Sequence, residues 1–197
     1  TNKRTMVVGT VITVTIAVLA LVALIWGVST YNTFIELDNQ VDQTWGNIDV
    51  LLKQRQDEIP NLIDTVKQYA EHEKDVFQDV SEKRKQMRQA STKTEKAEAN
   101  QAMQGALGNL FAVAEDYPDL KANENFQQLQ DRITGIENEI ADRRERYNEA
   151  VTIYNTKQDQ LPAALIASMM NLDEEDLFEV DRNEYTADNA YSGIQDM

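Results

Sequence analysis

The stretch FIELDNQVDQTWGNIDVLLKQRQDEIPNLIDTV, residues 34–66, has apolar side chains at steps of three and four, a spacing typical of an α-helix with one buried face. The pattern continues beyond this stretch in two rows whose members lie multiples of seven residues apart. One row comprises Phe34, Val41, Ile48, Leu62, Tyr69 and Val76, and the other Trp45, Leu52, Ile59, Val66, Val80 and Met87. A heptad pattern of this length predicts helices that pack against one another. Arg55 and Glu73 interrupt the pattern.

A further apolar row follows in the second half of the chain, and Asn123 stands before it as an expected N-cap. Between the rows, a shorter helical segment is expected from about Glu95 to Glu115, ended by Asp116-Tyr117-Pro118-Asp119. The later row comprises Phe126, Leu129, Ile133, Ile136, Ile140, Tyr147, Val151 and Tyr154. No strand pattern competes, so the expected fold class is all-α.

Pro60 determines the number of helices. If Pro60 lies in the first turn of a helix capped by Asp57, the chain forms an antiparallel four-helix bundle. The four helices would then cover residues 31–57, 58–90, 95–116 and 123–160. If Pro60 kinks one long helix instead, the bundle has three long members, which the unbroken heptad phase favours. We favour four helices.

The segment Met6–Val28, MVVGTVITVTIAVLALVALIWGV, contains no charged residue. At roughly 1.5 Å per residue its length is about 35 Å as a helix, enough to cross a bilayer. Trp26 and Tyr31 stand where an interfacial aromatic belt would lie. A signal peptide is the competing interpretation, but the apolar run is longer than a usual signal core. We therefore predict a transmembrane helix within residues 6–30.

The charges beside this segment predict its orientation. Lys3 and Arg4 precede it, whereas Glu36, Asp38 and Asp42 follow it. The cationic side of an anchor usually stays in the cytoplasm. We expect a single-pass protein of the cell membrane with the N-terminus cytoplasmic and the helical bundle outside.

The composition excludes several partners and chemistries. With 34 acidic and 19 basic residues among 197, the net charge of -15 opposes binding to nucleic acid. The absence of cysteine excludes disulfides, thiolate metal sites and a cysteine nucleophile. The apolar spacing within the acidic sequence favours a charged shell over a core rather than disorder.

The chain after the last long helix divides into an apolar and an acidic part. The run AALIASMMNL after Pro162 is too short to span a membrane. We expect it to cap the bundle end, and docking at the membrane interface is the alternative. From Asp173 onward acidic residues dominate, which predicts a solvated tail. The expected organisation is a short segment 1–5, a transmembrane helix 6–30, a bundle 31–170 and an acidic tail 171–197.

The pair Tyr-Asn occurs three times, at 31–32, 147–148 and 154–155, and the last two lie seven residues apart. Because Tyr147 and Tyr154 share the apolar row, they are expected to pack in the core. Asn148 and Asn155 lie about 100° further around the helix. They are expected to form, with Asn138, Arg144 and Glu137, a polar ladder that fixes which helices pair, in preference to a ligand site.

No catalytic, cofactor-binding or metal-ligating residue is predicted. His72 is the single histidine, and Glu71-His72-Glu73 lacks the second histidine of a zinc motif. Glu137 and Glu139 face different sides of a helix, so they do not form an acid–base pair. Gly105 and Gly108 belong to no phosphate-binding loop and are expected to allow close helix contact. Neither a cofactor nor a small-molecule substrate is expected.

Several short motifs follow one another in a fixed order: Ile59-Pro60-Asn61-Leu62, then Tyr117-Pro118-Asp119-Leu120-Lys121-Ala122-Asn123, then the two Tyr-Asn pairs at 147–148 and 154–155. In this order they resemble the LemA family of membrane-anchored proteins, over residues 6 to about 180. The resemblance implies one N-terminal transmembrane helix followed by a bundle of long helices, and it implies no activity or catalytic residue. Leu161, where the family usually has an aromatic residue, and the acidic tail depart from it.

Three functional hypotheses follow. The first is a membrane-anchored helical scaffold, attached through residues 6–28, that self-associates and holds protein partners not identified by the sequence. The second is a sensor or regulatory adaptor at the membrane. The third, an enzyme, lacks supporting residues. We favour the scaffold.

The orientation is testable by labelling because the chain contains no cysteine. Ser192→Cys in the acidic tail and Thr5→Cys beside the anchor each provide a single thiol. In whole cells a membrane-impermeant maleimide is expected to label the first variant and spare the second, because the cationic end stays inside. Labelling in the reverse pattern would place the bundle in the cytoplasm and favour the adaptor.

Overall fold

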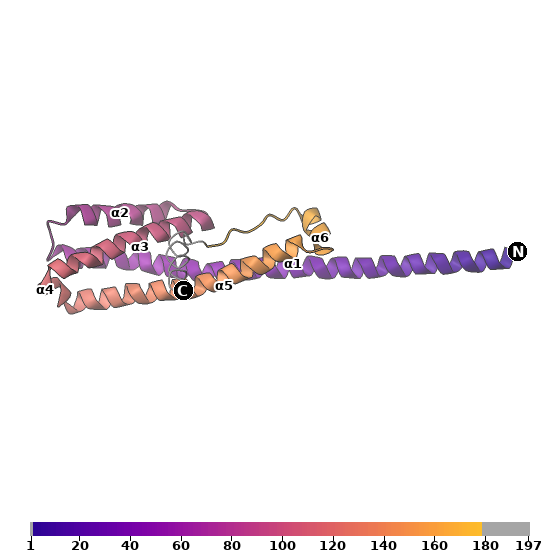
Figure 1. The fold of residues 1–197 in the computed structure, drawn as a ribbon, viewed down its shortest axis with the longest axis horizontal. Coiled ribbons are helices and arrows are strands. Elements are labelled where there is room, and N and C mark those ends of the chain that lie inside the picture. Colours follow the sequence, from indigo (N-terminus) through magenta and orange to yellow (C-terminus); the bar gives the residue numbers. More distant parts are fainter. Residues whose placement is uncertain (1, 179–197) are drawn as a thin grey trace, which may run out of the picture. The chain divides into compact units, whose positions relative to one another are not determined.

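The computed structural model describes the backbone of residues 2–178 and the side-chain surroundings of residues 7–178. Within this part of the chain all regular secondary structure is helical (Figure 1), which confirms the all-α class. The helices are α1 Asn2–Lys67, α2 Lys74–Gln89, α3 Lys93–Asp116, α4 Pro118–Lys121, α5 Glu124–Asp159 and α6 Ala163–Met170.

The chain divides into two compact units. Among the described residues, the first unit combines residues 2–42 with Ala150–Glu175, and the second combines Gln43–Glu149 with residues 176–178. The two longest helices, α1 and α5, contribute residues to both units. Each unit has buried apolar side chains of its own.

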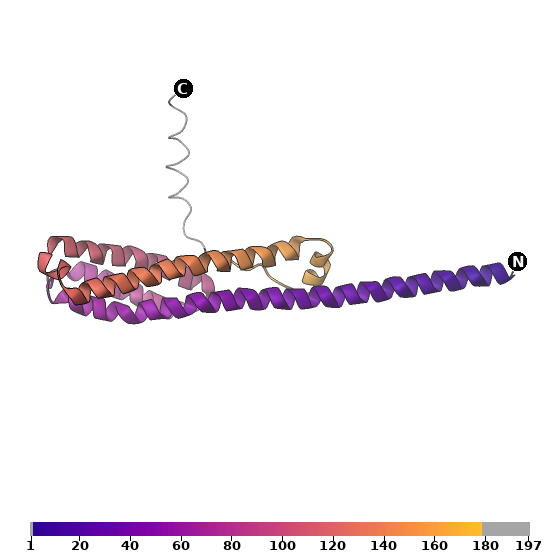
Figure 2. The same cartoon turned by 90° about the horizontal axis from the view of Figure 1, so that it is seen from below.

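The second unit contains the main hydrophobic core. Parts of α1 and α5 lie beside α2 and α3 in a four-helix arrangement (Figure 2), with α4 at the corner between α3 and α5. Its most buried side chains come from all of these helices and include Ile59, Leu62, Val66, Val80, Met103, Leu110, Leu120, Phe126 and Ile133. The row members Ile59, Leu62, Val66, Val80, Phe126 and Ile133 are therefore confirmed as core residues, with Tyr69, Val76 and Met87 at the partly buried edge. The core side chains of α3 and α4 belong to none of the predicted rows.

Pro60 neither starts nor ends a helix, so the predicted boundary between residues 57 and 58 is wrong. Helix α1 continues through Pro60 to Lys67. A proline removes the hydrogen bond to the carbonyl four residues earlier, which here belongs to Gln56. That carbonyl instead accepts a hydrogen bond of 3.2 Å from Arg84 Nε on α2. A neighbouring helix thus supplies the donor that the proline lacks.

The break that separates the first two bundle helices lies at residues 68–73, where the sequence has neither glycine nor proline. Tertiary contacts hold this turn. Asn123 Nδ2 donates to Tyr69 Oη at 2.8 Å, and Tyr117 Oη donates to Glu73 Oε1 at 3.0 Å. The core nevertheless continues across the turn, because Ala70 in the turn and Phe77 in α2 are buried in the same cluster.

Two other helix starts have local causes. Asn123 Oδ1 accepts a hydrogen bond of 2.9 Å from Phe126 N, which confirms the expected N-cap of α5. Thr92 and Glu95 form a reciprocal capping box at the start of α3. The hydrogen bonds that the Glu95 carboxylate accepts, two from Ser91 and one from Thr92 N, lower the pKa of this carboxyl group.

In the first unit, α1 changes from uncovered to buried along its length. The side chains from Val7 to Ile25 are exposed, whereas Phe34 and Val41 are buried. Buried partners in the same unit include Val151, Tyr154, Ala163 and Ala167. Asn171, with a φ of 50°, ends α6 in the left-handed conformation that asparagine tolerates.

The interaction of Arg84 with the Gln56 carbonyl predicts a coupling between Pro60 and Arg84. Arg84→Met is expected to lower the free energy of unfolding by about 1–2 kcal/mol, because it leaves a partly buried carbonyl without its donor. In a Pro60→Ala background the same change is expected to cost less, since an alanine restores a backbone N–H that can bond to that carbonyl. Denaturant unfolding of the four variants measures the coupling.

Arg88→Met is the matched control, because Arg88 is an exposed arginine on the same helix. It is expected to leave the free energy of unfolding almost unchanged. Strict additivity of the Pro60 and Arg84 changes would contradict the compensation.

Candidate functional site

Arg55, which interrupts the heptad pattern, lies at the centre of the second unit with a side chain only 1% exposed. Its Nη1 donates to Asn100 Oδ1 on α3 at 2.7 Å and forms an ion pair with Glu137 on α5. Burial lowers the pKa of the Arg55 guanidinium, and the charge of Glu137 acts in the opposite direction. One side chain of α1 therefore connects three helices.

Further ion pairs connect α1 to other helices of the same unit. Arg132 on α5 pairs with Glu58 on α1, and Lys96 on α3 pairs with Asp49 on α1 at 2.5 Å. The Arg55–Glu137 pair differs from them because the guanidinium is fully buried, and its Nε has no hydrogen-bond partner among the described residues. If the helices paired differently, the buried Arg55 charge would lose these few partners, and the folded state would lose stability. The arrangement therefore favours a role of Arg55 in helix pairing.

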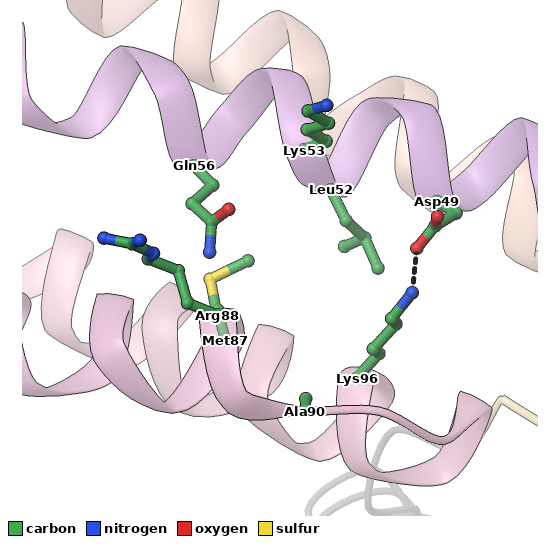
Figure 3. A pocket seen from close by; sticks show the side chains of 8 residues that line it. All are labelled: Asp49, Leu52, Lys53, Gln56, Met87, Arg88, Ala90 and Lys96. Carbon is green, nitrogen blue, oxygen red and sulfur yellow. Dashed lines mark hydrogen bonds and ion pairs between the residues drawn. The ribbon is translucent and has the colours of Figure 1, made fainter.

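A hollow of about 300 Å³ lies beside these pairs, between α1 and the ends of α2 and α3 that face each other (Figure 3). Lys96 reaches across it to Asp49, while Lys53 points away from it. Its polar groups therefore do not converge on one point, as the groups of a small-molecule site do. The lining residues are Asp49, Leu52, Lys53, Gln56, Met87, Arg88, Ala90 and Lys96.

The acidic residues and the histidine that we weighed for catalysis lie apart. His72 and Glu71 are both exposed in the turn after α1. Glu137 is engaged by Arg55, and Glu139 is exposed. Within residues 7–178, no three histidine or acidic side chains are grouped as metal ligands would be.

The two asparagines of the repeated Tyr-Asn pair bind backbone, which corrects the expected ladder between helices. Asn148 accepts from Phe178 N at 2.8 Å and donates to Phe178 O at 3.2 Å. Asn155 does the same with Glu175, at 3.0 and 2.9 Å. Asn138, a further member of the expected ladder, is exposed. Each amide thus satisfies both peptide groups of one residue in the segment Leu172–Phe178.

The spacing of the pair explains this arrangement. Seven residues of a helix advance about 10.5 Å, and three residues of extended chain advance about 10 Å. Two asparagines one heptad apart therefore match residues three apart in an extended segment running in the opposite direction. Each of the two contacts lies within one unit, that of Asn155 in the first and that of Asn148 in the second. We call these contacts the asparagine clamp.

Other side chains of α5, and one of α3, reinforce these contacts. In the first unit Gln158 Nε2 donates to Asp173 O at 3.1 Å. In the second unit Tyr147 Oη donates to Asp176 O at 3.0 Å, and Thr94 Oγ1 donates to the Asp176 carboxylate. Residues 173–178 of the expected solvated tail are thus held by hydrogen bonds, although Asp173, Glu174 and Asp176 are exposed. The remainder of that tail lies outside the described residues.

Aromatic packing completes the clamp in the second unit. The buried Tyr147 ring meets the partly buried Trp45 ring edge to face, with centroids 5.5 Å apart, and the buried Phe178 ring lies 6.0 Å from Trp45. In the first unit Tyr154 is buried as expected. Burial and the nearby Asp38 and Glu175 raise the pKa of Tyr154, so its phenol stays protonated.

Comparison with known proteins identifies relatives. The model of the LemA family matches residues 44–190. Magnetosome proteins MamQ 1 and MamQ 2 of Paramagnetospirillum magneticum are each 25% identical over 158 residues, which cover 67% of this chain and 58% of theirs. Magnetosome protein MamQ of Magnetospirillum gryphiswaldense is 26% identical over 167 residues, 71% of this chain and 61% of that protein. The chain thus spans about three fifths of the length of these relatives.

The asparagine clamp predicts a selective effect of Asn148→Ala. The variant loses two hydrogen bonds, worth together about 2 kcal/mol, so local release of the segment is expected to become roughly 30-fold more frequent. Limited chymotrypsin digestion of the full chain in nanodiscs measures this release as faster cleavage after Phe178. Asn138→Ala, an exposed asparagine on the same helix, is the control, and equal cleavage of both variants would contradict the clamp.

Proposed function

The chain belongs to the LemA family, and from this premise we propose that it is a membrane-anchored helical scaffold that self-associates. The family and the long apolar start of α1 support a membrane-associated helical protein. The role as a scaffold, the self-association and the absence of a reaction of its own are the parts that we propose. Its protein partners are not identified by any residue described above.

The observation that carries the proposal is that the apolar side chains of α1 are exposed near its start and buried near its end. The side chains of Val7 and Leu24 are 63% and 64% exposed, although both belong to an uncharged run long enough to cross a bilayer. Further along the same helix Ile59, Leu62 and Val66 are fully buried in the core. Water solvates such an apolar run poorly, so lipid is its natural environment. The orientation, with the bundle outside, remains a prediction.

Self-association is supported by the outer side of α3. Between Ala99 and Ala114 this helix contains no charged residue, in a chain with a net charge of -15. Gly105 and Gly108 are exposed, and a methyl group added at either would meet no described atom within 4 Å. No described part of the same chain therefore packs closely on these two glycines, and the close helix contact expected of them stays a prediction.

The same face suits a second copy of the chain. Two strongly acidic molecules repel each other, and an uncharged face minimises this repulsion where they meet. Exposed glycines let a partner backbone approach closely, whereas in a helix with no partner they cost about 1 kcal/mol each relative to alanine. We therefore assign the association to the outer face of α3, defined by Gln101, Gln104, Gly105, Gly108, Asn109 and Ala112.

Substitution of glycine by lysine tests this assignment. Gly108→Lys is expected to shift the full chain in mild detergent toward monomer, because it places a long charged side chain on the proposed interface. Gly46→Lys is the matched control, since Gly46 is also an exposed helical glycine with open space around it. Both variants add one positive charge and improve helix propensity equally.

Chemical cross-linking and light scattering measure the oligomeric state. Wild type and Gly46→Lys are expected to cross-link as oligomers and Gly108→Lys to remain largely monomeric. A wild-type monomer would overturn self-association, and oligomers unaffected by Gly108→Lys would remove the interface from α3.

A further inference from the structure

Helix α6 has an apolar face that no described part of the chain covers. Leu161, Leu165 and Met169 are 79%, 62% and 79% exposed. Leu165 and Met169 lie four residues apart and therefore on one side of α6, and Leu161 lies in the turn just before this helix. The opposite side, with Ala163 and Ala167, is buried in the first unit. No charged residue occurs between Asp159 and Asp173, in a chain that is 27% charged.

The position of α6 within the first unit indicates what lies next to this face. A methyl group placed on Gly27 would be 3.9 Å from Ile166 Cδ1, so α6 packs beside the end of the apolar run of α1. Trp26, at the same level of α1, is 37% exposed, as an aromatic residue at the border between lipid and water would be. If the run from residue 6 crosses the hydrocarbon, α6 lies at the boundary of the bilayer.

We propose that α6 is a second membrane contact, which inserts Leu161, Leu165 and Met169 into the interfacial layer of the same bilayer that holds α1. This inference rests on the proposed anchoring of α1. Helices that bind membranes on their own are usually longer and basic, whereas α6 has eight residues and no charge. It needs no independent affinity, because its attachment beside α1 gives it a high effective concentration at the bilayer.

The absence of charged residues in and around α6 favours contact with a bilayer. An acidic helix would be repelled by anionic lipid head groups, and acidic side chains next to its exposed face would favour water over lipid. The uncharged run from Gln160 to Leu172 separates the exposed face from those acids. A bilayer is therefore the occupant that the face fits best, in continuity with the lipid around α1.

Fluorescence quenching of single-cysteine variants of the full chain in nanodiscs tests the proposal. An environment-sensitive fluorophore is attached at Leu165→Cys or Met169→Cys on the exposed face of α6. Thr156→Cys, an exposed position on α5 in the same unit, is the water-facing control, and Ala20→Cys in the apolar run is the lipid-facing control. Brominated lipids quench from within the bilayer and iodide quenches from water.

Fluorophores at 165 and 169 are expected to lose fluorescence with brominated lipid, as at position 20, and to be shielded from iodide relative to position 156. Quenching at 165 and 169 by iodide alone, with position 20 in lipid, would overturn the contact of α6 while leaving the anchor intact. Iodide quenching at position 20 would overturn both. Shielding of 165 and 169 from both quenchers would indicate a protein covering the face and would also overturn the proposal.

Discussion

The burial of the Arg55 guanidinium constrains the second unit more than any apolar contact does. A charge taken out of water costs several kcal/mol unless acceptors lie in the correct positions. Here they come from two other helices, Asn100 on α3 and Glu137 on α5. Apolar rows with a heptad repeat tolerate a shift of one helix by a turn, because leucine, isoleucine and valine replace one another at little cost. Such a shift would leave the Arg55 charge unpaired, so this single residue selects one register among those that the apolar pattern allows.

Backbone polar groups elsewhere in the chain that lack a partner within a helix are likewise satisfied by side chains of other elements. The carbonyl of Gln56, which Pro60 leaves without a donor, is satisfied by Arg84 from α2. The peptide groups of Glu175 and Phe178, which belong to no helix, are satisfied by the amides of Asn155 and Asn148. Buried or partly buried backbone groups need partners, and side chains provide them where regular helices do not. The irregular parts of the fold are therefore held as specifically as its helices.

The surfaces to which we assign membrane contact and self-association share a lack of charge in a strongly acidic protein. They are the apolar run at the start of α1, the exposed face of α6 and the outer face of α3. Charge elsewhere keeps the surface hydrated and keeps copies of the chain apart, so uncharged surfaces are where lipid or another molecule approaches at least cost. This distribution of charge agrees with the proposed role of an anchored protein that holds other molecules together. Such a role requires no catalytic residue.

The sequence alone determined the all-α class, the core residues that belong to the apolar rows of α1, α2 and α5, the apolar run and the start of α5 at Asn123, because each depends on local patterns of spacing, hydropathy or capping. It did not determine the end of α1. Pro60 is a strong local signal that α2 overrides through Arg84, whereas the turn at residues 68–73 has no local signal and is held by Asn123 and Tyr117. The repeated Tyr-Asn pair was visible in the sequence, and half of its role, the packing of Tyr147 and Tyr154, followed from the heptad spacing. The target of its asparagines was decided by tertiary structure, because an amide that can bond to any peptide group does not encode which segment will reach it.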